Sequence, residues 1–144
     1  MTPTPSILDA VIASVTSGLP VMVTHFVAAL AVYVAGLAIY LLATPYHELK
    51  LVREGNVAAA VTFAGAIVGL AIPLAAMLRG ATSVPDILVW GAIAAFLQAA
   101  TFGIVLLLLR RLPESVAAGN VAAAIVAAAA QIGVGILNAG AMSG

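Results

Sequence analysis

Four long apolar stretches without a charged side chain constrain this chain more than any other feature. Each holds 23 residues and none contains Asp, Glu, Lys or Arg; they run from Val21 to Ala43, Asn56 to Leu78, Ile87 to Leu109 and Asn120 to Met142. About 20 helical residues cross a hydrocarbon core of about 30 Å. Backbone in lipid must pair its own polar groups, and these runs do not alternate as membrane strands do. The sequence therefore predicts an all-α membrane protein with four transmembrane helices.

The composition agrees with a lipid bilayer as the main surroundings of the chain. Hydrophobic residues make up 65% of the sequence and charged residues only 7%, with a net charge of zero, whereas a soluble domain carries about 25% charged residues. A neutral chain offers no basic field to attract nucleic acid. Cysteine is absent, which excludes disulfides, thiolate catalysis and cysteine-based metal sites.

The segment before the first apolar stretch has its own pattern. Ser6 to Gly18 is too short to span a bilayer, and it places four apolar residues on one helical face, namely Ile7, Val11, Ile12 and Val15. We expect a short N-terminal amphipathic helix at the membrane interface, separated from the first transmembrane helix by Pro20. A disordered tail is the alternative. Residues 1–5 carry no Lys or Arg, so we do not expect a cleaved signal peptide.

The chain contains an internal repeat. Gly55 to Arg79 aligns without gaps with Gly119 to Ser143, an offset of 64, and 11 of the 25 positions are identical, including all of GNVAAA. Each copy holds two helices, an even number, so both copies must have the same orientation in the membrane. We therefore predict a tandem parallel repeat of two-helix units, with an N-terminal segment at 1–19, a first repeat at 20–80 and a second at 81–144.

The distribution of cations predicts the orientation. The connections at 44–55 and 110–119 lie on one side of the membrane and hold Lys50, Arg53, Arg110 and Arg111, whereas the other side holds only Arg79. Short cytoplasmic loops carry an excess of Lys and Arg. We expect these two loops in the cytoplasm and both termini on the periplasmic side.

These segments carry a resemblance to a known family. The stretch TPYHELKLVREGNVAAAVTFAGAIVGLAIPLAA, the helix start with Pro85, Asp86 and Trp90, and the later GNVAAA and ILNAGAMSG resemble the YjfL-like bacterial inner-membrane proteins, the domain-of-unknown-function 350 family. The resemblance covers about residues 20–144. It implies a bacterial inner membrane, four helices with the domain present twice, no established activity, and a gene-neighbourhood link to membrane-stress and ATP-grasp systems. The two copies differ in their loops, because Ala118 occupies the position that corresponds to Glu54.

Polar residues form a stripe along the last apolar stretch. Asn120, Gln131 and Asn138 fall within about 40° of one another at 100° per residue. One interpretation is a conduit or solute site lined by Gln131 and Asn138. The other is hydrogen bonding between helices, with Gln98 or Thr101 as partners, because amides in hydrocarbon need partners.

Small residues recur at four-residue spacing on three of the predicted helices. Such residues let helix backbones approach closely in a membrane. They are Gly65 and Gly69, then Gly91, Ala95, Ala99 and Gly103, then Gly133. The pattern leaves open whether they pack within one subunit or between subunits. Their abundance favours a homo-oligomer.

Three helix positions have two interpretations each. Asn56 and Asn120 both follow a glycine at a predicted helix start, where they suit N-caps or an anion site. Pro73 should kink its helix and free the Gly69 carbonyl, which either coordinates a ligand or is absorbed by bending.

The first cytoplasmic loop holds the remaining candidates, His47, Glu48, Arg53 and Glu54. The loop is either a solvated polar segment or a surface that docks a cytoplasmic protein partner, and we carry the docking loop into the predicted function. His47 and Glu48 are adjacent, but two residues do not make a metal site, and no metal is expected.

The sequence predicts a protein that is not an enzyme and uses no cofactor, because no nucleophile–base pair, carboxylate pair or metal cluster has a catalytic spacing. The favoured function is an oligomeric structural or membrane-stress-associated component with a partner-docking loop. The alternative is an oligomeric channel or transporter for a small solute or ion, lined by the helix at 120–142.

Overall fold

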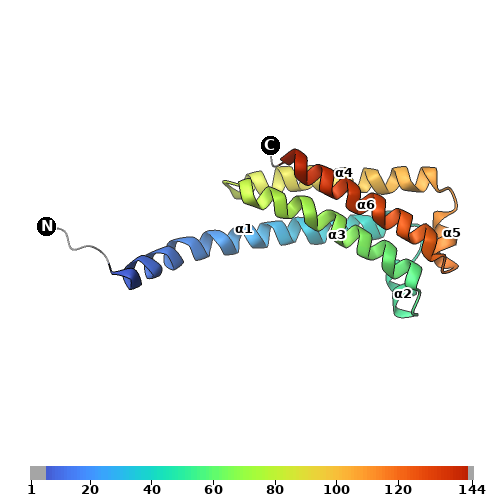
Figure 1. Ribbon diagram of the computed structural model, residues 1–144, viewed down its shortest axis with the longest axis horizontal. Helices are drawn as coiled ribbons and strands as arrows, with labels where there is room; N and C mark the ends of the chain where they lie inside the picture. Colours follow the sequence, from blue (N-terminus) through green and yellow to red (C-terminus); the bar gives the residue numbers. More distant parts are fainter. Residues whose placement is uncertain (1–5, 143–144) are drawn as a thin grey trace.

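The computed structural model describes residues 6–142, and that part of the chain forms helices and no strand. Four helices are long and apolar enough to cross a membrane: α1 (Ile7–Ala43), α3 (Val57–Gly80), α4 (Val84–Leu108) and α6 (Val121–Met142). Two short helices, α2 (Glu48–Arg53) and α5 (Leu112–Ala117), lie in the connections at one end of the bundle (Figure 1). The prediction of an all-α protein with four membrane-spanning helices is confirmed.

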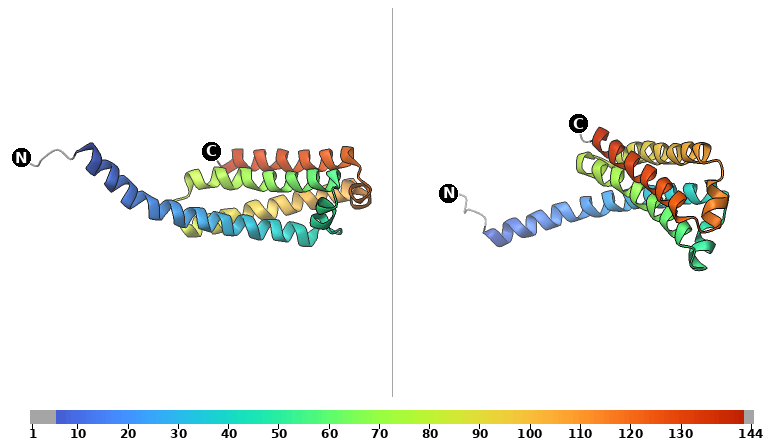
Figure 2. Two further views of the ribbon diagram at one scale, coloured as in Figure 1. Left: turned by 90° about the horizontal axis from the view of Figure 1, so that it is seen from below. Right: turned by 45° about the vertical axis from the view of Figure 1, so that its right-hand side comes forward.

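The first helix differs from the prediction. α1 runs for 37 residues from Ile7 and contains Pro20, so Ser6–Gly18 is not a separate helix but continues into the helix that holds Val21. A proline costs a helix one hydrogen bond and a local clash, whereas a break would expose several backbone groups at each new end. A capping box formed by Ser6 and Asp9 fixes the start. α1 bends in its N-terminal half (Figure 2).

Helices that correspond in the two predicted repeats lie side by side. α3 runs along α6, and α1 packs against α4 (Figures 1 and 2). The closest approach is between α3 and α6, because Gly65 faces the backbone of Ala128 and Gly135 lies against the backbone of Gly69. A side chain at these glycines would hold the helices apart, so the glycines set the spacing of the pair.

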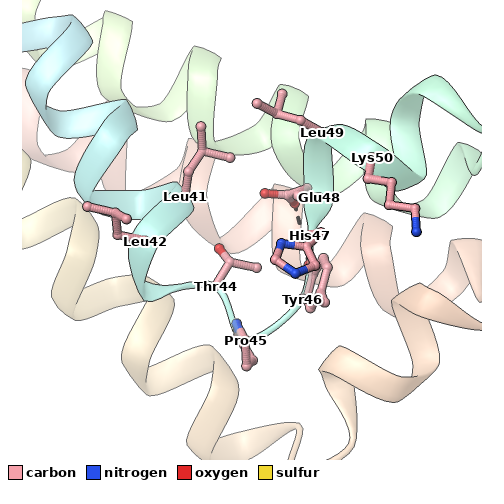
Figure 3. Close-up of a pocket in the computed structure, with 9 residues that line it drawn as sticks. All are labelled: Leu41, Leu42, Thr44, Pro45, Tyr46, His47, Glu48, Leu49 and Lys50. Atoms are coloured by element: carbon pink, nitrogen blue, oxygen red, sulfur yellow. Dashed lines mark hydrogen bonds between the residues drawn. The ribbon is translucent and has the colours of Figure 1, made fainter.

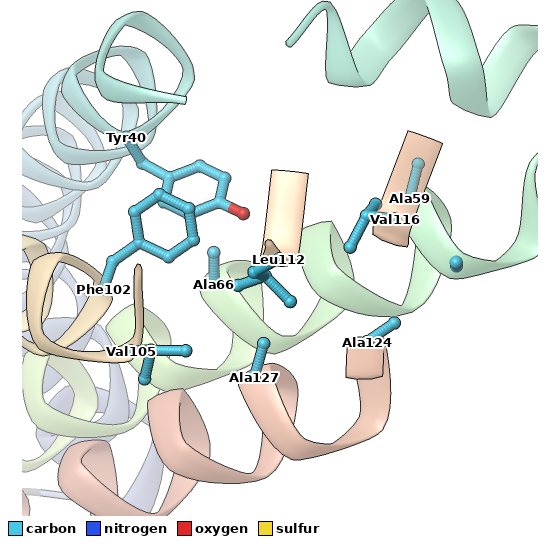
Figure 4. Close-up of a cluster of buried hydrophobic side chains, with 10 residues drawn as sticks. Tyr40, Ala59, Ala66, Phe102, Val105, Leu112, Val116, Ala124 and Ala127 are labelled. Carbon is cyan, nitrogen blue, oxygen red and sulfur yellow. The ribbon is translucent and has the colours of Figure 1, made fainter. Parts of the chain in front are cut away.

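A cluster of buried side chains closes the end of the bundle near the short helices. The ring of Tyr40 lies between Phe102, with ring centroids 4.7 Å apart, and Phe63, at 6.3 Å. Leu112 and Val116 of α5 point into the same cluster, and both are fully buried (Figure 4). The short helix α5 therefore packs between the long helices at this end of the bundle.

The two connections that contain short helices are built alike, although the sequence did not predict the helices. Each ends at a glycine in the left-handed region, Gly55 at φ 85° and Gly119 at φ 83°. The Gly55 amide donates to the Val52 carbonyl at 3.0 Å, and the Gly119 amide to the Val116 carbonyl at 2.9 Å. Glycine adopts this conformation without steric cost. The start of the motif GNVAAA is thus the turn that ends one helix and begins the next.

Candidate functional site

Two buried glutamines join α4 to α6 in the middle of the bundle. The Gln98 side-chain amide donates to the backbone carbonyl of Gln131 at 3.0 Å and to its side-chain oxygen at 2.5 Å. Gln131 is only 1% exposed and Gln98 6%. This contact is the one that the packing interpretation of the polar stripe requires, with Gln98 as the partner. Thr101 instead donates to Leu97 in its own helix at 2.8 Å.

Gly69 makes room for the glutamine pair. A Cβ atom at Gly69 would overlap the Gln98 amide nitrogen and would lie 2.7 Å from the Gln131 carbonyl oxygen. The Oε1 atom of Gln98 and the Nε2 atom of Gln131 are buried without a hydrogen-bond partner in residues 6–142. The pair therefore satisfies the side-chain nitrogen of Gln98 and the side-chain oxygen of Gln131. The other polar atom of each side chain is left buried without a partner.

The other members of the predicted stripe have different surroundings. Asn138 is 8% exposed and lines a cavity between the ends of α3, α4 and α6. Asn120 is exposed and accepts from the Ala123 amide at 3.1 Å, as an N-cap does. The three residues of the stripe thus have different roles. Asn120 caps a helix, Gln131 joins two helices and Asn138 lines a cavity.

The small residues divide into packed and open positions. Gly65 and Gly69 face α6, while Gly91 and Ala95 face α1 close to Val32 and Gly36. Ala99 lines the same small gap as Gly36. A Cβ at Gly103 or Gly133 would have no heavy atom of the described chain within 4 Å.

Sequence reasoning missed two glycines that the structure packs tightly. Gly36 meets Leu70 and Gly135 meets the Gly69 carbonyl. Gly135 follows Gln131 by one helical turn, and this spacing is the signal that could have revealed it.

Glu48 lies buried beneath the first loop. It is 2% exposed, and its Oε1 accepts from the Tyr40 hydroxyl at 3.0 Å and from the Tyr46 hydroxyl at 3.4 Å. Figure 3 shows Glu48 beside Tyr46. Glu48 therefore does not lie on the exposed surface of loop 44–55, unlike the other three predicted docking residues. The first residue of α2 points inward in the same way as Leu112, the first residue of α5.

The surroundings of Glu48 shift its acidity. Burial raises the pKa of the carboxyl to about 7 from 4.5, and the hydroxyls of Tyr40 and Tyr46 oppose this rise. Burial likewise raises the pKa of Tyr46. The Oε2 atom of Glu48 has no hydrogen-bond partner in the described chain. Glu48 can therefore gain or lose a proton near neutral pH.

An open cavity of about 580 Å³ lies beside this carboxyl, lined by 41, 42 and 44–50 (Figure 3). Exposed charges surround it. Lys50 pairs with Glu54 at 3.8 Å, but both side chains are largely in solvent, so the pair adds little stability. The remaining docking candidates, His47, Arg53 and Glu54, are exposed. Within residues 6–142, His, Asp and Glu side chains form no group of three that could hold a metal ion.

Asn56 links the two loops. Its oxygen accepts from the Ala59 amide at 2.9 Å, and its Nδ2 donates to the carbonyls of Val116 and Ala117 at 3.0 and 3.1 Å. The residue is an N-cap that also ties α5 to the start of α3.

Pro73 is buried inside α3, which continues to Gly80. The carbonyl of Gly69, one turn earlier, is the one that a proline leaves without its helical donor. Gly135 lies against this carbonyl, so α6 covers it.

Comparison with known proteins places the chain in a family. Residues 14–142 match the family described as Domain of Unknown Function (DUF350). The chain is 34% identical over 119 residues to the UPF0719 inner membrane protein YjfL of Escherichia coli strain K12, covering 83% of this chain and 90% of the relative. The protein of the same name from Escherichia coli O157:H7 gives the same values. No solved structure matches. The chain is an integral inner-membrane protein and belongs to the DUF350 family.

Proposed function

We propose that this protein is a non-enzymatic structural component of the inner membrane that assembles from several copies. The observation that carries the proposal is the N-terminal half of α1, in which every residue from Ser6 to Thr24 is exposed. No other helix of the described chain covers this part (Figure 2).

The length of α1 makes this surface informative. At 1.5 Å per residue its 37 residues extend about 55 Å, against a hydrocarbon core of about 30 Å. The excess carries Ile7, Val11, Ile12 and Val15 on one face, with Asp9 and Thr16 elsewhere. An apolar face outside the hydrocarbon needs a cover. The same face of a second copy is the proposed cover, because the two stripes are apolar, uncharged and of equal length.

The glutamine pair favours this structural function over a conduit. A path lined by α6 would need Gln131 to face a solute, but Gln131 is 1% exposed and accepts from Gln98. Hydrogen bonds between helices stabilise membrane bundles. Gln131 therefore supports packing of the subunit.

The second part of the proposal is that loop 44–55 docks a cytoplasmic protein in a response to membrane stress. His47, Arg53 and Glu54 are exposed there, next to the open cavity beside Glu48. The excess of Lys and Arg in loops 44–55 and 110–119 supports a cytoplasmic position for them and a periplasmic position for both termini.

Cysteine cross-linking in membranes tests the assembly. The chain has no cysteine of its own, so each introduced cysteine reports without background. Val11→Cys on the apolar face should give a disulfide-linked dimer on oxidation. Thr16→Cys, about 140° away around the helix, is the matched control and should remain largely unlinked. Equal linking of the two variants, or a detergent-corrected mass of one chain, would count against the proposal.

A further inference from the structure

A cavity of about 460 Å³ opens at the end of the bundle where α3 and α6 finish and α4 begins. Ligand pockets have volumes of about 300–1,000 Å³, so the size suits a ligand or part of one. The glutamine pair and the proposed functions make no use of this cavity.

The wall of the cavity is polar at one end and apolar at the other. Asp86, in the first turn of α4, lines the cavity near the helix end, and Trp90 lies one turn deeper. Ile93 and Leu97 continue the same wall, and Leu97 is about 16 Å from Asp86 along the helix at 1.5 Å per residue. The cavity therefore extends from the charged start of α4 along an apolar wall.

A charged group and an unsatisfied amide lie at this end of the cavity. The hydroxyls of Thr82 and Ser83 both donate to Oδ2 of Asp86, at 2.7 and 2.8 Å, and so hold its carboxylate in place. Asn138 on α6 is 8% exposed, and its Nδ2 is buried without an acceptor in the described chain. An enclosed amide donor on a cavity wall indicates a missing acceptor.

The chemistry of a ligand follows from these groups. A carboxylate and an exposed indole that line one cavity, one helical turn apart, suit an ammonium group, through charge and through a cation–π contact. A buried amide donor suits an ester or phosphate oxygen. Arg79 is exposed next to the lining residue Gly80, and a guanidinium suits a phosphate. The apolar wall suits an acyl chain.

We propose that this cavity binds a phospholipid with a primary-ammonium headgroup. The ammonium lies at Asp86 and Trp90, an oxygen of the phosphate or ester region accepts from Asn138, and one acyl chain follows Ile93 and Leu97. Such a lipid matches the order of groups along the wall, from charged to apolar with depth.

The single tryptophan of the chain, Trp90, reports on this site directly. Full-length protein is reconstituted into phosphatidylcholine vesicles that contain equal mole fractions of either phosphatidylethanolamine or phosphatidylglycerol with brominated acyl chains. Bromine quenches indole fluorescence on contact. We expect stronger quenching by the brominated phosphatidylethanolamine. Equal quenching by the two lipids would mean bulk lipid only, and stronger quenching by phosphatidylglycerol would mean an anionic lipid held by Arg79; either result overturns the proposal.

Variants separate the site from the rest of the membrane surface. Asp86→Asn keeps the shape and one acceptor but removes the charge, and should abolish the preference for phosphatidylethanolamine. Asn138→Ala should reduce it. Glu114→Gln, the same loss of charge at an exposed residue of α5, should leave the preference unchanged. Circular dichroism confirms the fold of each variant. A preference that survives Asp86→Asn in a folded protein overturns the proposal.

Discussion

Glu48 places a carboxyl group where the second half of the chain has Leu112, and both side chains are buried, at 2% and 1% exposure. Two tyrosine hydroxyls satisfy one oxygen of the carboxyl, and the other oxygen is enclosed without a partner in the described chain. A buried carboxyl with half its acceptors unpaired is more stable with its proton than without it.

Stability should therefore fall as the pH rises. The pKa of Glu48 is about 7 in the folded protein against 4.5 ordinarily, so the folded state binds the proton more tightly than the unfolded state. The stabilisation is fully present below pH 4.5 and is lost as the pH passes through 7. At about 1.4 kcal/mol per pKa unit, the loss is on the order of 3 kcal/mol. Thermal unfolding in detergent at pH 5 and pH 8, followed by circular dichroism, measures it.

Glu48→Gln should remove this pH dependence and should make the protein more stable than the wild type at pH 8. Glu54→Gln is the matched control, because Glu54 is exposed in the same loop, and it should keep the wild-type dependence. If Glu48→Gln and the wild type respond alike to pH, the carboxyl does not titrate in this range.

The glutamine pair gives a second prediction at the residue scale. Gln98→Met or Gln131→Met leaves the partner amide buried without its bond, which costs about 1–3 kcal/mol. The double variant leaves no orphaned side chain, so its loss of stability should be smaller than the sum of the two single losses. Unfolding in denaturing detergent measures all three. Additive losses would show that the two side chains do not depend on each other.

Glycines that share the same spacing in the sequence have different surroundings in the helix pairs. Gly65→Ala should destabilise the bundle, because the new Cβ would overlap the backbone of Ala128 on α6. Gly103→Ala should be neutral or stabilising by up to about 1 kcal/mol, since alanine is the better helix former and a Cβ there meets open space in the described chain. In thermal unfolding, Gly65→Ala should lower the melting temperature and Gly103→Ala should not; equal destabilisation would contradict this packing.

The sequence predicted the spans well because charge-free runs of this length have one structural solution in lipid. It failed at the N-terminal end of α1, where Pro20 was a plausible boundary, because continuing the helix keeps more backbone hydrogen bonds than ending it. It also missed α2 and α5. Six-residue helices have no periodic signal of their own, and these two are fixed by Gly55 and Gly119 and by burial of Glu48 and Leu112.

The candidate residues were predictable where only one arrangement could satisfy their hydrogen bonds. Gln131 had to find a partner in lipid, and Gln98 on the neighbouring helix was within reach. The direction of Glu48 could not be predicted, because a charged loop residue is usually exposed, and the hydroxyls of Tyr40 and Tyr46 become visible only in three dimensions. Gly103 and Gly133 matched the small-residue pattern, yet the pattern does not show which face has a neighbour.

At the scale of the whole molecule, the cations predict how the bundle sits in the membrane. A fluorescent reporter fused after Gly144 should be dark if the C-terminus is periplasmic, and alkaline phosphatase at the same place should be active. The same two reporters inserted in loop 110–119 should give the opposite pattern, because Arg110 and Arg111 predict a cytoplasmic position for this loop. Fluorescence from the fusion at Gly144 would show that the orientation is the reverse of the predicted one.

The pairing of α3 with α6 has a consequence for how the protein is made. Chains fold while they are synthesised, N-terminal part first, and α3 enters the membrane more than forty residues before α6 begins. Until α5 leaves the ribosome, Asn56 lacks the carbonyls of Val116 and Ala117, and until α6 follows, Gly65 lacks the backbone of Ala128 that covers it in the finished bundle. A chain that stops before α6 therefore leaves in the membrane a glycine surface without its partner helix.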